Sequence, residues 1–246
     1  MSLHEGILAL LILVAAVLYS SVGHGGASGY LAAMALMGIS PAEMRPVALS
    51  LNILVAVIAT FKYYRAGAFS WRLFWPLAIA SIPCAYLGGT LTLSGHLYKP
   101  VVGIVLIYSA WHIFRTLHEP ERPVVERPAL WVLLSAGGVL GFLSGLTGVG
   151  GGIFLSPLIL YYRWAKVKTV SGIAAAFILV NSVAALAGVA KLAPGLPAAL
   201  PYWAVAAVVG GLIGAEYGSK RLGNPAIKKL LALVLLIAGM KMIATA

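Results

Sequence analysis

Two glycine-rich stretches hold the residue types and the spacing that could do chemistry in this chain. Residues 23–29 read Gly-His-Gly-Gly-Ala-Ser-Gly and residues 148–152 read Gly-Val-Gly-Gly-Gly, so the two stretches start 125 residues apart. Glycine has no Cβ and readily adopts positive φ, which lets the backbone unwind and approach a ligand or another helix closely. Exposed backbone N–H groups at a helix start bind anions. The pattern therefore predicts an anion site built from backbone in both stretches.

The setting of both stretches is apolar. Each follows a long hydrophobic run and precedes a short one, residues 30–39 in the first case and 153–162 in the second. Unpaired backbone groups at membrane depth are tolerated only where they line a cavity or are buried in protein. Two such breaks at matching positions of two halves are typical of a transporter site. Close packing of helices through small residues is the alternative explanation for either stretch taken alone.

The composition places the chain among membrane proteins. Of its 246 residues, 61% are hydrophobic and 9% are charged, with a mean hydropathy of +1.00, whereas soluble domains carry about 25% charged residues. A soluble enzyme with an anchor is excluded because no long polar segment could fold in water. The single cysteine, Cys84, excludes a disulfide framework and a cysteine-based metal site. The net charge of +11 is typical of basic cytoplasmic loops, so no nucleic-acid partner is expected.

The apolar runs give each half of the chain five segments. At 1.5 Å per residue, the short run after each glycine stretch is about half a membrane helix. We therefore predict an all-α polytopic membrane protein with two inverted repeats, each made of four spans plus a short broken helix. The predicted segments are residues 6–22, 30–39, 47–64, 73–93 and 98–117 in the first half, and 129–146, 153–162, 169–190, 199–218 and 227–244 in the second.

The connections follow from the charged and proline-rich positions. Residues 118–128 are dense in charge and proline, and we predict that they form a cytoplasmic linker between a first membrane repeat, 1–117, and a second, 129–246. Glu43 and Arg45 are expected in the connection that precedes the span at 47–64. Residues 1–22 lack the basic start of a signal peptide, so they are interpreted as a retained first helix.

The distribution of basic residues predicts the topology. If each short helix returns the chain to the side from which it came, the second half is inverted, and the 17 Lys and Arg divide into 13 on one side and 4 on the other. With four crossings in each half they divide into 8 and 9. Positive residues concentrate on the cytoplasmic side, so the inverted repeat is favoured, in the cell inner membrane and with both termini periplasmic. The minority side holds Arg45, Lys99, Lys191 and Lys241.

Residues 148–158, Gly-Val-Gly-Gly-Gly-Ile-Phe-Leu-Ser-Pro-Leu, resemble the signature of the sulfite exporter TauE/SafE permeases. The resemblance covers nearly the whole chain, including the repeat length, the weak linker and the C-terminal span. It implies a duplicated transporter of small sulfur-containing anions, such as sulfite and organosulfonates. We expect no cofactor. The first copy departs from the pattern, because it carries His24, and Ala27-Ser28 where the second copy has Gly152-Ile153.

Family members commonly open the span after the short helix with an element like Thr-Ser-Leu. In this chain Leu49-Ser50-Leu51 keeps the serine, whereas the second half has Ala174-Ala175-Ala176. This departure from the family pattern weakens the expectation of a hydroxyl contact in the second half.

The starts of the short helices are the predicted anion site. If these helices begin near Ser28 and Ile153, their unpaired N–H groups and positive dipole ends lie inside the membrane, where they attract anions. An inverted repeat would bring the two starts together near the midplane. His24 is the one ionisable residue in the two glycine stretches, and such groups at this depth are functional candidates. Because histidine has a usual pKa of about 6.5, His24 suits proton coupling or contact with an anion.

Neutral polar side chains on the following spans complete the predicted site. Ser50 and Asn52 lie early in one span and Asn181 lies in the corresponding span, although polar residues there also form interhelical hydrogen bonds. The expected partners are a small anion, the lipid bilayer and coupled protons; no metal or catalytic residue is predicted. The predicted substrate-binding residues are Gly23, His24, Gly25, Gly26, Ser28, Ser50, Asn52, Gly148, Gly150, Gly151, Gly152 and Asn181.

Two charged residues outside the glycine stretches are also interpreted. Glu216 is expected to pair with Lys220 or Arg221 at the cytoplasmic boundary. Arg45 either guides anions at the outer mouth or ends a helix.

Two other functions stay open from the sequence. A channel for the same anions would use the same fold and would lack saturation and counterflow. Residues 26–29 also match the Gly-x-Ser-Gly element of rhomboid-type intramembrane serine proteases, in which Ser28 would need a histidine base such as His112.

Overall fold

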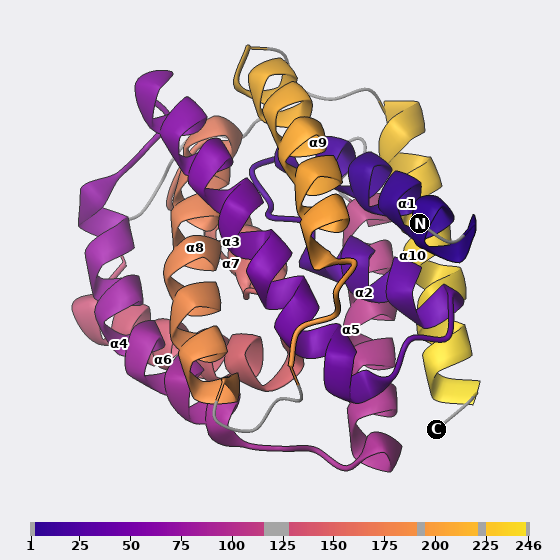
Figure 1. The fold of residues 1–246 in the computed structure, drawn as a ribbon. Coiled ribbons are helices and arrows are strands. Elements are labelled where there is room, and N and C mark those ends of the chain that lie inside the picture. Colours follow the sequence, from indigo (N-terminus) through magenta and orange to yellow (C-terminus); the bar gives the residue numbers. More distant parts are fainter. Residues whose placement is uncertain (1–2, 116–127, 191–194, 221–224, 245–246) are drawn as a thin grey trace.

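The computed structural model describes residues 3–115, 128–190, 195–220 and 225–244 (Figure 1). Within these ranges the chain forms ten α-helices and no strand. The helices are α1 (Leu3–Ser20), α2 (Ala27–Leu36), α3 (Pro41–Arg65), α4 (Trp71–Thr90), α5 (Gly95–Arg115), α6 (Leu130–Thr147), α7 (Gly152–Tyr161), α8 (Val167–Val189), α9 (Leu200–Lys220) and α10 (Pro225–Ala244).

The helix lengths fall into two classes. Eight helices have 18 to 25 residues, and five of them, α3, α4, α6, α8 and α9, are long and apolar enough to cross a membrane. In contrast, α2 and α7 have 10 residues each, which is about 15 Å of helix, or half of the hydrocarbon thickness. The predicted all-α polytopic membrane fold is thus confirmed. The two short helices begin at Ala27 and Gly152, within three residues of the positions expected for them.

One predicted connection is wrong. Glu43 and Arg45 lie in the first turns of α3, which begins at Pro41. Proline is favoured at the first helical position because its missing N–H would be unpaired there in any case. Glu43 is also favourable there, since the start of a helix attracts negative charge.

The predicted linker between the repeats, residues 118–128, lies outside the described residues except for Pro128, which comes shortly before α6. The division of the chain into a first repeat, 1–117, and a second, 129–246, therefore stays a prediction.

The bundle is held together by contacts between its two halves. The helix α1 packs on α9, α6 on α4, α3 on α8, and α5 on α10 (Figure 1). Glycines make two of these approaches close: a Cβ on Gly141 of α6 would overlap the Ser81 carbonyl of α4, and one on Gly214 of α9 would overlap the Val17 carbonyl of α1. Small residues four apart allow such backbone contact between membrane helices. The stripes are Gly137, Gly141 and Gly145 on α6, and Gly210, Gly214 and Gly218 on α9.

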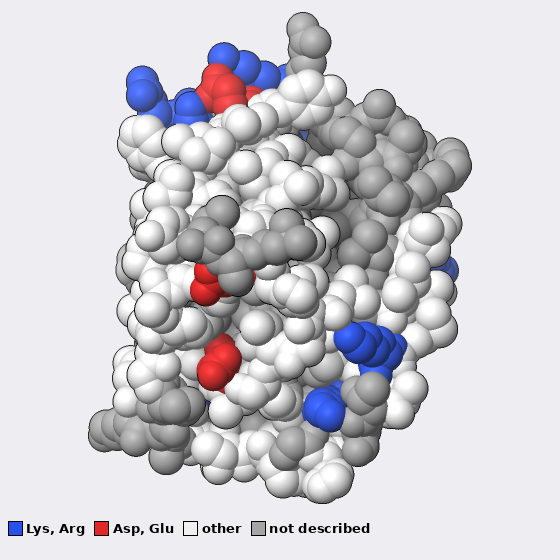
Figure 2. Space-filling model, turned by 45° about the vertical axis from the view of Figure 1, so that its right-hand side comes forward, with Lys and Arg blue, Asp and Glu red and all other residues white. Residues whose placement is uncertain are grey.

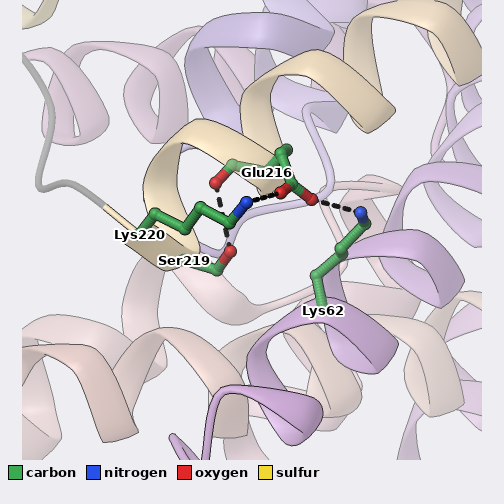
Figure 3. A network of polar contacts seen from close by, with 4 residues as sticks. All are labelled: Lys62, Glu216, Ser219 and Lys220. Carbon is green, nitrogen blue, oxygen red and sulfur yellow. Dashed lines mark hydrogen bonds and ion pairs between the residues drawn. The ribbon is translucent and has the colours of Figure 1, made fainter.

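Basic residues gather at one end of the bundle, at the top of Figure 2. There Glu216 of α9 accepts hydrogen bonds from Lys220, one turn further on, and from Lys62 of α3 (Figure 3). The expected pair of Glu216 with Lys220 is confirmed, and the contact with Lys62 adds a link between the two halves. The start of α8 lies at the same end, because the Gly172 backbone abuts the Ala68 carbonyl just after α3.

Candidate functional site

The two half-length helices begin inside the protein. Gly26 is the N-cap of α2, with φ of 101°, and Gly151 is the N-cap of α7, with φ of 77°. Both are left-handed conformations that favour glycine over any residue with a Cβ. Gly26, Ala27, Gly151 and Gly152 are all buried. The polar ends of both helices are therefore shielded from bulk water. An electrostatic interaction with a ligand is stronger in such a buried place than in water.

The two glycine stretches converge on the same two side chains. A Cβ placed on Gly25 would overlap Asn52 Oδ1 of α3 and lie 3.0 Å from Ile178 Cγ2 of α8. A Cβ placed on Gly150 would overlap Asn52 Nδ2 and lie 2.9 Å from Ile178 Cγ2. Residues that lie 125 positions apart in the chain thus flank one point in the centre of the protein, at the crossing of α3 and α8.

Asn52 binds the start of α2 to the second half. Its Oδ1 accepts a hydrogen bond from the Ala27 backbone N–H at 3.1 Å, and its Nδ2 donates to Ser182 Oγ of α8 at 3.2 Å. Both side chains are fully buried. Asn52, a residue of α3, therefore caps the start of α2. Ser182 was missed by the sequence analysis, although it directly follows the predicted Asn181.

His24 reaches across to the start of α7. Its Nε2 lies 3.2 Å from the Gly152 carbonyl oxygen and 3.1 Å from Ser156 Oγ. Because a carbonyl oxygen only accepts hydrogen bonds, the geometry assigns a proton to Nε2. A histidine from the first glycine stretch thus contacts α7, the half-length helix that follows the second stretch. Ser156 was also missed, even though it lies in the Ser-Pro pair of the signature.

Ser28 and Ser50 make internal hydrogen bonds. The Ser28 hydroxyl donates to the Tyr19 hydroxyl at 2.9 Å, so its partner is a tyrosine rather than the histidine that a protease would require. The Ser50 hydroxyl donates to the Pro46 carbonyl of its own helix at 2.8 Å. The structure places Ser28 at the start of α2 and turns Ser50 back onto α3. The side chain of His112 lies outside the described part of the chain.

Asn181 has a buried carboxamide without an assigned role. It is fully buried on α8, and neither Nδ2 nor Oδ1 has a hydrogen-bond partner among the described residues. Leaving such a group unpaired costs about 1–3 kcal/mol, so each case calls for an explanation. The amide is chemically free to bind a water molecule or a substrate.

Arg45 binds the ends of two helices. Its guanidinium donates to the Leu91 carbonyl at 2.7 Å and the Gly88 carbonyl at 2.6 Å, both at the end of α4, and to the Gly145 carbonyl near the end of α6. A cation is favourable at these carboxyl ends, which carry partial negative charge. Arg45 therefore does not end a helix, since it lies in the first turns of α3, and its guanidinium instead binds the carboxyl ends of α4 and α6.

Gly23 and Gly148 open the two stretches and differ in what they contact. A Cβ on Gly23 would meet Ser171 near the start of α8, whereas one on Gly148 would lie 3.0 Å from Arg45 Cγ. Both have positive φ, 77° and 79°. They shape the exits from α1 and α6 and do not share the central contact of Gly25 and Gly150.

An all-α membrane bundle that contains two half-length helices with buried starts is typical of multi-pass membrane transporters. The sequence profile of the sulfite exporter TauE/SafE family matches residues 8–242, so the chain belongs to that family. The resemblance stated from the glycine signature is thereby confirmed.

Curated relatives are named as transporters. A probable membrane transporter protein of Sinorhizobium fredii is 40% identical over 239 residues, which is 96% of this chain and 97% of the relative. A probable membrane transporter protein of Bacillus subtilis is 28% identical over 245 residues, covering 90% of this chain and 92% of the relative. No solved structure matches the chain significantly.

Proposed function

We propose that this transporter is a secondary permease that moves small sulfur-containing anions, such as sulfite or organosulfonates, and holds them at the starts of α2 and α7. The observation that carries the proposal is the convergence of both glycine stretches on Asn52 and Ile178. Helix starts attract anions through free N–H groups and the helix dipole, so little basic side-chain charge is needed at the site. The sulfur chemistry of the substrate comes from the family to which the chain belongs.

The proposal includes two inverted repeats. In the two halves, helices α1 to α5 correspond in order to helices α6 to α10. The contact of α1 with α9 then has its counterpart in the contact of α6 with α4, and the contact of α3 with α9 has its counterpart in the contact of α8 with α4. The pairs α3 with α8 and α5 with α10 each join equivalent helices of the two halves. This pattern supports a two-fold relation between residues 1–117 and 129–246, and such a relation would put the starts of α2 and α7 near the membrane midplane.

Flux measurements in proteoliposomes test the substrate. The purified protein is assayed with sulfite, thiosulfate, sulfonates and carboxylates as a panel. Saturable uptake and counterflow of a sulfur oxyanion are expected from a carrier, with carboxylates transported less well. Flux that neither saturates nor shows counterflow would contradict the carrier and favour a channel. Absence of flux for every anion would contradict the proposed substrate class.

Both termini are predicted to be periplasmic in the cell inner membrane. The ends of α3 and α9 carry Lys62 and Lys220, which share Glu216 at the basic end of the bundle. The positive-inside rule assigns such an end to the cytoplasm. Epitope tags at both termini should be accessible to antibody in cells with a permeable outer membrane and an intact inner membrane, whereas a tag inserted after Gly67 should not. Cytoplasmic location of either terminus would contradict the inverted topology.

His24 is predicted to make transport depend on pH. The imidazole contacts the start of α7, and the ring of Tyr19 lies nearly perpendicular to it, at 83°, with 6.5 Å between the ring centroids. His24→Gln keeps a hydrogen-bond donor but cannot titrate, so it should transport with a flattened pH profile. His24→Ala should lose the pH dependence and about tenfold in affinity, because a hydrogen bond near a charge is lost. The measurement is initial flux between about pH 5 and pH 8, the range in which histidine titrates.

The exposed His4 on α1 offers the matched control. His4→Gln is expected to keep the wild-type pH profile, since its side chain lies at the surface. If both His24 variants transported at the wild-type rate with the wild-type profile, His24 would be a bystander and a coupled proton would need another carrier.

A further inference from the structure

We propose that the substrate anion binds at the start of α7 rather than equally at both half-length helices, and that Ser144 is a substrate-binding residue. The expected ligand is a small oxyanion with at least two acceptor oxygens. The inference rests on the proposed function, because it selects one of the two helix starts that this function invokes.

The start of α2 is already occupied by the protein's own groups. Asn52 Oδ1 accepts the hydrogen bond of the Ala27 N–H, which is the first N–H of the helix. The Tyr30 hydroxyl donates to the Gly25 carbonyl at 2.8 Å, and a Cβ on Gly26 would lie 2.6 Å from the same hydroxyl. The Ser28 hydroxyl is used by Tyr19. The first N–H, the Gly25 carbonyl and the Ser28 hydroxyl at this helix start are thus paired within the protein, and the rings of Tyr19 and Tyr30 pack beside it.

The start of α7 lacks these groups. With the offset of 125 residues that relates the glycine stretches, Ser144 takes the position of Tyr19 and Leu155 takes the position of Tyr30. Gly152 is the first residue of α7. A Cβ placed on Gly152 would overlap Cδ1 of Ile178, the neighbouring side chain from α8. An isoleucine cannot accept a hydrogen bond. Ile178 therefore cannot cap the start of α7 in the way that Asn52 caps the start of α2.

Ser144 provides the second, independent observation. Its side chain is fully buried, and its Oγ has no hydrogen-bond partner among the described residues. Its Cβ lies 3.2 Å from the place that a Cβ on Gly151, the N-cap of α7, would take. A buried hydroxyl without a partner is costly, and an oxyanion at the helix start would accept its hydrogen bond. Ser144 thus fits as a ligand group at this site.

The imidazole of His24 lies on the same side. Its Nε2 lies against the Gly152 carbonyl and Ser156 Oγ in the first turn and a half of α7. The positive helix dipole, backbone N–H groups and the Ser144 hydroxyl are therefore grouped at the start of α7, with the imidazole ring beside them and its Nε2 proton donated to the Gly152 carbonyl. At α2, the carboxamide oxygen of Asn52 occupies the place that an anion would need. The asymmetry in residue types thus selects α7.

The test compares Ser144→Ala with a matched serine variant. Ser109 on α5 is equally buried, but its hydroxyl donates to the Val105 carbonyl of its own helix. With sulfite as the probe in proteoliposomes, Ser144→Ala should raise KM at least about tenfold, because a hydrogen bond to a charged ligand is lost. Ser109→Ala should keep the wild-type KM. Thermal unfolding in detergent provides the second readout.

The two readouts separate the possible outcomes. Ser144→Ala should keep or raise the Tm of the ligand-free protein and reduce the Tm increase that sulfite gives to the wild type. If the wild type transports sulfite while Ser144→Ala keeps its KM and its sulfite-dependent Tm increase, the assignment of Ser144 is wrong and the proposed function stands. A lower ligand-free Tm with unchanged KM would make Ser144 a packing residue and overturn the assignment. If the wild type transports no member of the oxyanion panel, both proposals fail.

Discussion

Gly150→Ala is expected to remove most transport activity. Gly150 has φ of 84°, where a residue with a Cβ is strained by about 1–2 kcal/mol. The new Cβ would also overlap Asn52 Nδ2 and lie 2.9 Å from Ile178 Cγ2, and overpacking of this kind adds about 1–3 kcal/mol. Asn52 cannot turn aside freely, because its amide is bonded to Ala27 and Ser182. We therefore expect a flux per inserted molecule that is more than about tenfold lower, together with a reduced Tm.

Gly38→Ala is the matched control for this substitution. Gly38 also has a positive φ, of 75°, but a Cβ there would meet nothing within 4 Å. The control therefore carries the backbone strain alone and should transport normally. Gly151→Leu should behave like Gly150→Ala, since φ is 77° and Phe177 Cε1 would lie 3.0 Å from the new Cβ. Equal flux from the Gly150 and Gly38 variants would mean that the glycine stretches only connect helices.

The helices were predictable because hydrophobic length is a direct physical requirement of the bilayer. The short run that begins at Gly152 could be told from a full span by length alone, since ten residues cover about half of the membrane. The positive φ of Gly26 and Gly151 also followed from residue type, because glycine is favoured in that conformation. The prediction of a connection before residue 47 was wrong. Glu43 and Arg45 suggested a polar loop, whereas the first turn of a helix accepts charge and proline.

The partners across the site could not be predicted, because they depend on how distant segments pack. Nothing in the sequence shows that His24 contacts Gly152, 128 residues away, or that Asn52 bonds Ser182. Ser50 and Ser28 looked equally available, but their hydroxyls are used inside the protein. Ser144 carried no signal of its own, since a serine near a helix end usually bonds a carbonyl of the preceding turn. Its unpaired hydroxyl became visible only in the packed structure.

Arg45→Ala is expected to destabilise the protein by about 3–5 kcal/mol, because it would leave the buried carbonyls of Gly88 and Gly145 and the partly buried Leu91 carbonyl without their hydrogen bonds, at about 1–3 kcal/mol for each buried group. Arg45 is 7% exposed, so water cannot readily replace the guanidinium. Arg45→Lys keeps the charge, but one ammonium group cannot reproduce the planar fork that spans α4 and α6, so it should recover only part of the loss. Thermal unfolding in detergent measures both variants. Arg72→Ala, at the exposed start of α4, should change the free energy of unfolding by less than about 0.5 kcal/mol.

The same variants distinguish the two roles considered for Arg45. An arginine that guides anions at the outer mouth acts through its charge, so Arg45→Lys would restore flux fully and Arg45→Ala would keep the wild-type Tm. An arginine that binds helix ends acts through geometry, so stability and flux should fall together, and lysine should restore both only in part. Its Cγ lies 3.0 Å from the place of a Cβ on Gly148, where the second glycine stretch leaves α6. Loss of Arg45 should therefore also loosen the segment that leads to the start of α7, and flux should fall further than the remaining folded fraction explains.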